Sequence, residues 1–214
     1  MDKLLNSIHE ELLEGLILES IDPEEPIKVR EVPESWRLLG SGNYAAVLYH
    51  PEYEDYAVKI YAPGRPGIRE EAEVYTRLGS HPAFSELMHD GGSFLVLRRL
   101  RGITFYDCIK RGVPIAEQAV RDIDEALRDA KARGLHPHDV HAKNVMQLDG
   151  RGLVVDISDF LKREDCMMWE DFKKAYYRLY RPLASRHAVP VPDAVLQAVR
   201  RGYRLWRKSQ GRSR

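Results

Sequence analysis

The segment from His138 to Asn144 gathers the polar side chains best suited to chemistry. Asp139 and Asn144 stand five residues apart in what we expect to be a tight loop, so both can point into one cleft. Asp139 could accept a proton from a hydroxyl group there, while the carbonyl oxygen of Asn144 could bind a hard cation. Asp156 ends an apolar run and would supply a second oxygen ligand, because Mg²⁺ is held by a few protein oxygens together with substrate phosphates. The pattern indicates chemistry at a phosphate bound with magnesium.

Two features earlier in the chain are weak alone but fit the same chemistry. Gly40 and Gly42 form a Gly-x-Gly turn, which could leave room for a phosphate or could only supply the positive φ of a tight turn. Lys59 interrupts an apolar strand, where it could reach water from an edge or pair with phosphates and an acid. Glu70, Glu71 and Glu73 lie on the helix that follows, and one of these three acids could supply the counter-charge that a buried ammonium group needs. Glu71 shares a helix face with the buried Leu78.

The first half of the chain is expected to contain the strands that position these residues. Apolar residues recur at helical spacing over residues 3–19, and Pro23, Pro26 and Pro33 then predict a short extended connection. We expect strands at Trp36–Leu39, Ala45–Tyr49, Tyr56–Tyr61 and Ser93–Leu100, with a helix at Ile68–Leu78.

The second half is expected to be mainly helical. A long helix is predicted at Ile115–Arg133, and Asp149-Gly150 indicates the turn of a hairpin. Two further helices are expected to bury their apolar residues in a core: Trp169, Phe172, Tyr176, Tyr177, Leu179 and Tyr180 on one, and Val195, Val199, Tyr203 and Trp206 on the other, with its arginines outside.

Composition narrows the possible partners. The 214 residues carry equal numbers of acidic and basic side chains, so no overall positive charge favours nucleic acid or an anionic membrane. The charge is unevenly spread: residues 1–35 hold ten acids and three bases, and residues 195–214 hold seven bases and no acid. Such runs are typical of solvated helix faces, which could also lie against each other or bind a partner. Two cysteines without a Cys-x-x-Cys spacing, an acidic start and no long apolar run predict a cytoplasmic protein with no membrane partner.

The order of these motifs resembles that of the protein-kinase-like superfamily. A glycine-rich loop, a strand lysine, a helix glutamate, an Asp-x-x-x-x-Asn loop and a metal-binding aspartate follow one another between about Leu38 and Phe160. The resemblance implies an α+β, bilobal fold in a single kinase-like domain, residues 1–214. Residues 1–35 would form an N-terminal helix and extension, 36–100 a small β-rich N-lobe, and 101–214 a reduced helical C-lobe.

The resemblance also implies that ATP and Mg²⁺ are the cofactors. Gly40 and Gly42 would lie over the phosphates, with Val47 as a further candidate for contact with the nucleotide. Lys59, paired with Glu71, would position the α and β phosphates.

The resemblance assigns the catalytic and metal-binding roles to the later motifs. Asp139 would orient the attacking hydroxyl, and Asn144 and Asp156 would bind Mg²⁺. Lys143 is a candidate catalytic residue near the transferred phosphoryl group, although it could equally be an exposed loop lysine. For His141 we expect a structural hydrogen-bonding role.

Several residues depart from the usual kinase pattern, and they narrow the kind of kinase that the sequence predicts. Ala45 stands where a third loop glycine is usual, and Pro137-His138 replaces the usual His-Arg, so the arginine that reads a phosphorylated activation loop is absent. No Ala-Pro-Glu stretch follows Asp156, and we expect no regulation by activation-loop phosphorylation. Asp156-Ile157-Ser158 is similar to RIO-type atypical kinases, and Asp139-Val140-His141 to aminoglycoside phosphotransferases and lipopolysaccharide kinases.

These features predict a kinase that transfers the γ-phosphoryl group of ATP to a hydroxyl acceptor, a serine or threonine of a protein. The sequence resembles small bacterial Ser/Thr-kinase-like proteins. Two alternatives remain open: a kinase for small-molecule or sugar hydroxyls, suggested by the Asp-x-His motif, and a pseudokinase scaffold that binds nucleotide without transfer.

Overall fold

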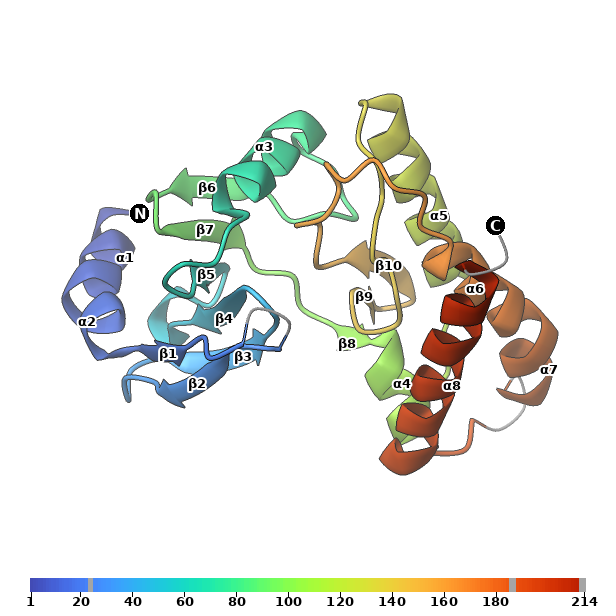
Figure 1. Cartoon of the computed structure of the whole chain (residues 1–214). Helices are drawn as coiled ribbons and strands as arrows, with labels where there is room; N and C mark the ends of the chain where they lie inside the picture. The colour runs from blue at the N-terminus through green and yellow to red at the C-terminus, as the bar shows by residue number, and fades with distance from the viewer. Residues whose placement is uncertain (23–24, 185–187, 212–214) are drawn as a thin grey trace. The chain divides into compact units, whose positions relative to one another are not determined.

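A computed structural model describes residues 1–22, 25–184 and 188–211. The chain divides into two units, whose elements are drawn in Figure 1. The first unit comprises residues 1–101, 126–138 and 155–165, and the second comprises residues 102–125, 139–154 and 166–214. Each unit is described by itself.

The first unit is built on a five-stranded antiparallel sheet in the order β3-β4-β5-β7-β6. Its strands are β3 (Arg37–Ser41), β4 (Ala45–Tyr49), β5 (Tyr56–Tyr61), β6 (Leu87–Asp90) and β7 (Phe94–Arg98), accompanied by α3 (Ile68–Leu78). Alternation along β5 places Val58 and Ile60 on one face and Lys59 and Tyr61 on the other. All four side chains are buried, so both faces of this central strand are covered.

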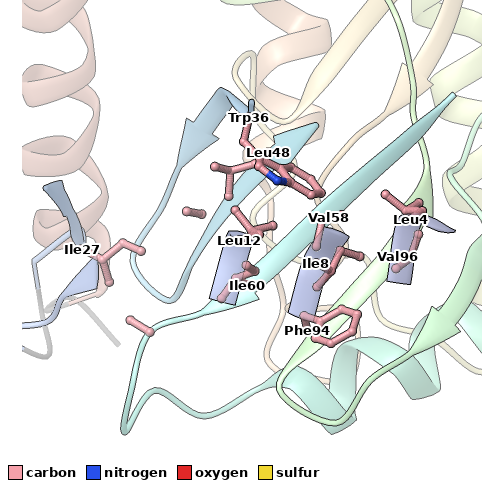
Figure 2. Packing of buried hydrophobic residues seen from close by; sticks show 12 residues of the cluster. Leu4, Ile8, Leu12, Ile27, Trp36, Leu48, Val58, Ile60, Phe94 and Val96 are labelled. Carbon is pink, nitrogen blue, oxygen red and sulfur yellow. The ribbon is translucent and has the colours of Figure 1, made fainter. Parts of the chain in front are cut away.

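The N-terminal residues cover one face of this sheet. They form α1 (Asp2–Ser7), a π-helical turn (Ile8–Leu12), α2 (Leu13–Gly15), and the strands β1 (Ile17–Glu19) and β2 (Lys28–Glu31), which pair with each other. Leu4, Ile8 and Leu12 are buried in a cluster with side chains of β4, β5 and β7 (Figure 2). The apolar stripe expected for the N-terminal helix therefore has the sheet as its partner.

The prediction of one helix over residues 3–19 is wrong at its C-terminal end. The helix stops at Gly15, and Leu16 already has extended backbone angles. A Cβ atom at Gly15 would lie 2.9 Å from the Pro33 ring, so the absence of a side chain lets two distant segments approach closely. The expected extended connection contains a strand, residues 28–31, that the sequence analysis did not predict; Pro23 lies outside the described residues.

Most other predicted elements of the first half are confirmed. The structure has β4, β5 and α3 at the predicted bounds, and it shifts or shortens the other two predicted strands to β3 and β7. The sequence analysis missed β6 and, in the second unit, the short strand β8 (Ile103–Thr104) and α4 (Phe105–Arg111).

The second unit has a three-stranded sheet in the order β10-β9-β8, with helices beside it (Figure 1). The predicted hairpin is confirmed as β9 (Val145–Leu148) and β10 (Arg151–Val154), and both turn residues have left-handed φ angles, 50° at Asp149 and 76° at Gly150. The predicted long helix is α5 (Glu117–Ala132), whose last residues, 126–132, belong to the first unit. A Cβ atom at Gly152 would lie only 2.1 Å from the Ala119 carbonyl oxygen, so glycine lets β10 lie directly on α5.

The C-terminal helices correct one expectation. They are α6 (Met168–Ala175), a π-helical turn (Tyr176–Tyr180), α7 (Arg181–Ala184) and α8 (Asp193–Gly211). Trp169 and Tyr176 are buried as expected, but Tyr177 and Leu179 are exposed, and so are Val195, Val199 and Trp206 of α8. The prediction that α8 buries these side chains in a core is therefore wrong. Of its predicted outward arginines, Arg200 and Arg201 are exposed, whereas the Arg204 side chain, Arg212 and Arg214 lie outside the described part.

No helix formed by residues 1–22, 25–184 and 188–211 combines the length and the apolar composition needed to cross a membrane.

A buried carboxylate ties α5 to β10. Asp122 accepts hydrogen bonds from Arg151 Nε at 2.6 Å, Gln118 Nε2 at 2.8 Å and the Gly152 backbone N–H at 3.0 Å. Burial alone would raise the pKa of Asp122, but the bonds from Arg151, Gln118 and Gly152 outweigh it and lower the pKa below its ordinary value.

We predict that Asp122→Asn lowers the free energy of unfolding by about 1–3 kcal/mol near neutral pH, because a buried carboxylate that accepts hydrogen bonds from three residues loses its charge. The folded pKa is depressed, so the contribution is present above the ordinary aspartate pKa of about 3.9 and is lost as the pH falls through the folded pKa. Urea unfolding at several pH values should therefore show the two proteins converging in acid. Glu125→Gln, at an exposed position of the same helix, is the control. A constant difference across this pH range would contradict the assignment.

Candidate active site

Three of the predicted site residues meet within the first unit. Lys59 Nζ, on β5, lies 2.8 Å from Oε1 and 2.7 Å from Oε2 of Glu71, on the first turn of α3. The same Nζ lies 3.4 Å from Asp156 Oδ1, just after β10. The Lys59 side chain is 11% exposed and that of Glu71 is 0% exposed. The interpretation of Lys59 as an edge lysine reaching water is therefore wrong.

The charges of this triad stabilise one another. Burial alone would lower the pKa of Lys59, but the negative charges of Asp156 and Glu71 raise it above its ordinary value. Burial alone would raise the pKa of Asp156, but the Lys59 charge and the Ser158 N–H outweigh it and lower that pKa. The side chain of Asp156 keeps 41% of its surface exposed. An ionised, partly exposed carboxylate fits the oxygen ligands that Mg²⁺ prefers.

The local sequence explains where Glu71 lies. Gly67 precedes α3 with a left-handed φ of 113°, a conformation that glycine adopts without strain, and its carbonyl oxygen accepts the Glu71 N–H at 2.9 Å. The helix therefore begins in a way that puts Glu71 in its first turn. Alternation of side chains along β5 then presents Lys59 to the same side of the sheet.

Two tyrosines that the sequence analysis missed also interact with Glu71, Tyr61 through a hydrogen bond and Tyr75 through the charge of the carboxylate. The Tyr61 hydroxyl donates to Glu71 Oε2. Burial, followed by the negative charges of Glu71 and Asp156, raises the pKa of Tyr75 well above its ordinary value. Spacing could have revealed both residues, because Tyr61 is two residues from Lys59 on a strand and Tyr75 is four residues from Glu71 on a helix.

The Gly-x-Gly segment forms the end of β3 and the start of its turn. Neither glycine has a left-handed φ, and a Cβ atom at Gly40 or Gly42 would meet nothing within 4 Å. The interpretation that they supply a positive φ is therefore wrong, and protein packing does not demand glycine at either position. Val47 is half-buried on β4 and pairs directly with Lys59, so the two side chains share one face of the sheet.

The Asp139–Asn144 loop lies in the second unit and is tight, as expected. Asp139 has a left-handed φ of 55°, which is unusual for a residue with a side chain. Its carbonyl oxygen accepts Asn144 Nδ2 at 3.0 Å, and the His141 carbonyl accepts the Asn144 N–H at 2.8 Å. Because the Asn144 amide nitrogen is used within the loop, its carbonyl oxygen is the atom suited to a cation. His141 Nδ1 accepts the Lys143 N–H at 3.3 Å, in keeping with a structural role.

Lys143 is exposed, but its ammonium group is not surrounded only by water. Its Nζ lies 4.4 Å from the centroid of the Tyr106 ring, a distance suited to a cation–π interaction. The Tyr106 N–H donates to the Ala142 carbonyl at 2.8 Å, and its hydroxyl donates to Asp193 Oδ1 at 2.6 Å. The loop is thus linked to α4 and α8. The catalytic role of Lys143 stays a prediction.

Comparison with known proteins gives one clear relative. No family model matches the chain. A Bacillus subtilis (strain 168) protein named "Putative serine/threonine-protein kinase YrzF" is 32% identical over 168 residues, and the match covers 72% of this chain and 73% of the relative.

Two solved structures are also similar in part. Both are mutant forms of the Mycobacterium tuberculosis PknI kinase domain, with 24% and 23% identity and a TM-score of 0.43 each. The match covers 58% of this chain and 60% and 59% of the two domains, which is less than two thirds of their length.

The Lys59–Glu71 pair yields a stability prediction. We expect Lys59→Met to lower the free energy of unfolding by about 3–5 kcal/mol, because the Glu71 carboxylate is left buried without its cation. The double variant Lys59→Met/Glu71→Met should recover much of that loss, since an apolar pair replaces an isolated charge. The control is Arg30→Gln, which breaks the exposed Arg30–Glu19 pair and should cost less than about 1 kcal/mol. A double variant no more stable than Lys59→Met, measured by urea unfolding, would contradict this account.

Proposed function

The chain belongs to the protein-kinase-like superfamily, and on that premise we propose that it transfers the γ-phosphoryl group of ATP to a hydroxyl group, on a serine or threonine of a protein. The Lys59–Glu71–Asp156 triad is the observation that carries the proposal. Phosphoryl transfer depends mainly on positioning and on neutralising charge, and these residues supply a fixed ammonium group and an ionised acid.

Within this proposal Lys59 contacts the α and β phosphates of ATP, held in place by Glu71. Asp156 and Asn144 would hold Mg²⁺, since each offers an oxygen of the kind that a hard cation prefers. When bound, the ion would neutralise phosphate charge. The open space beside Gly40 and Gly42 supports the approach of phosphates to that backbone, and Val47 supports contact with the nucleotide.

Asp139 is proposed to accept the proton of the attacking hydroxyl. Its left-handed backbone is held by the bond from Asn144 Nδ2, and strained residues maintained by their surroundings are common at functional sites. Lys143 is proposed to stabilise the transferred group. The protein acceptor is supported by the name of the Bacillus subtilis relative, "Putative serine/threonine-protein kinase YrzF".

The experiment that tests this function is incubation with γ-labelled ATP and Mg²⁺. We expect label on a protein acceptor with the wild type, and a loss of about 10³-fold or more with Asp139→Asn, which removes the base but suits the left-handed φ. ATP affinity should change little, because Asp139 contacts the hydroxyl and not the nucleotide. Asp165→Ala, at an exposed carboxylate, is the control. Label on an added sugar would favour the small-molecule kinase. ATP binding without any transfer would favour the pseudokinase. Undiminished transfer by Asp139→Asn would show that Asp139 does not accept the proton of the hydroxyl group.

The role of the glycine loop can be tested separately from folding. A Cβ atom at Gly40 meets no protein atom, so Gly40→Ala should keep the stability within about 0.5 kcal/mol of the wild type. If phosphates approach the backbone there, its ATP affinity should fall about tenfold, or about 1.4 kcal/mol, by titration calorimetry. Gly202→Ala, also in open space but on α8, is the matched control and should bind ATP normally. Unchanged affinity in Gly40→Ala would contradict phosphate binding at this loop.

A further inference from the structure

We propose that Tyr61 is a positioning residue, which fixes the Glu71 carboxylate and through it the Lys59 ammonium group. The ion pair would then be maintained by contacts inside the first unit, with no need for a phosphorylated activation segment. The proposal concerns the same site as the proposed function, and its catalytic consequence rests on that function.

Tyr61 and Lys59 reach the Glu71 carboxylate from the same strand. Lys59 and Tyr61 are two residues apart on β5 and project from the same face of the sheet. Both reach the carboxylate of Glu71, which has no exposed surface: Nζ lies within 2.8 Å of each oxygen, and the Tyr61 hydroxyl donates to Oε2. The Glu71 carboxylate is thus bound by two side chains of one strand. A movement of α3 away from β5 would break both interactions together.

The second support is where Tyr61 packs. A Cβ atom at Gly67 would lie 3.4 Å from Cε1 and 3.8 Å from the hydroxyl oxygen of Tyr61. Gly67 immediately precedes α3, so the tyrosine ring lies beside the start of the helix while its hydroxyl binds the first turn. Tyr61 therefore fixes both the position and the rotation of the helix end that carries Glu71.

The third support is the chemistry of the donor. Burial and the negative charge of Glu71 raise the pKa of Tyr61 far above its ordinary value, so the hydroxyl keeps its proton and remains a donor at every physiological pH. A neutral donor satisfies Oε2 without adding a positive charge that would compete with Lys59. When Lys59 contacts a phosphate, Oε2 still has a partner and Glu71 has no reason to move.

The position of Lys59 explains why this matters. Its Nζ stands between two acids, with Asp156 Oδ1 at 3.4 Å on one side and Glu71 on the other. If Glu71 loosens, the ammonium group is drawn toward Asp156, which removes it from its place and occupies an oxygen proposed for Mg²⁺. The sequence lacks the arginine before Asp139 that reads a phosphorylated activation loop, and no Ala-Pro-Glu stretch follows Asp156.

The test is Tyr61→Phe, which keeps the ring and removes only the donor. A first measurement needs no nucleotide: the rate at which a small amine-acylating reagent modifies Lys59, followed by mass spectrometry with exposed Lys28 as the internal reference. We expect Lys59 to be modified at least threefold faster in Tyr61→Phe, because its partner is less firmly held. Tyr56→Phe is the matched control, since Tyr56 lies on the same strand but on the opposite face.

A second measurement joins the inference to catalysis. Tyr61→Phe should lower kcat/KM for ATP about tenfold while the KM for the acceptor stays unchanged, and p-aminophenylalanine at position 61, which restores an N–H donor, should recover most of the loss. The proposal would be overturned if Tyr61→Phe kept both the Lys59 modification rate and the kcat/KM of the wild type. It would also be overturned if p-aminophenylalanine at position 61 recovered none of the lost kcat/KM. If the wild type transfers no phosphoryl group, the proposed function fails, whereas the Lys59 modification rate still decides whether Tyr61 positions the pair.

Discussion

A carboxylate with no solvent exposure is costly unless its charge is paired and its oxygens accept hydrogen bonds, and Glu71 is in that position. This requirement joins α3 to β5, because Glu71 is paired with Lys59 and accepts a hydrogen bond from Tyr61, both on the strand. Asp156 adds a second acid to the same ammonium group. The placement of a strand, a helix and the segment after β10 is thus coupled to one ion pair.

The N-terminal segment covers the face of the sheet opposite the Lys59–Glu71 pair. Leu4, Ile8 and Leu12 cover Val58 and Ile60, which alternate with Lys59 along β5. Burial of this apolar surface contributes on the order of 25 cal/mol per Å², and it keeps water from the strand that carries the lysine. A segment that contributes no predicted site residue therefore helps to set the dielectric environment of the site.

Local patterns predicted the elements whose structure depends on neighbours in sequence. The β4 and β5 strands, α3 and the Asp149-Gly150 hairpin follow from alternation, helical periodicity and turn chemistry, and Lys59 meets the glutamate assigned to it. The errors arose where distant residues decide. Gly15 ends the N-terminal helix beside Pro33, and periodicity alone cannot tell that Val199 and Trp206 on α8 are exposed. Tyr61 was missed because an aromatic residue in an apolar strand looks like core, and only the partner helix reveals its hydroxyl as a donor.

The balance of charge explains why tyrosines suit this site. Lys59, Glu71 and Asp156 together carry one excess negative charge, located at the acid that keeps 41% of its side-chain surface exposed. A second lysine or arginine beside Glu71 would neutralise that excess and weaken the attraction of Asp156 for a cation. The Tyr61 hydroxyl instead satisfies Oε2 of Glu71 with no added charge. The full charge of Asp156 then remains for a divalent cation, and Lys59 keeps the positive charge that a phosphate needs.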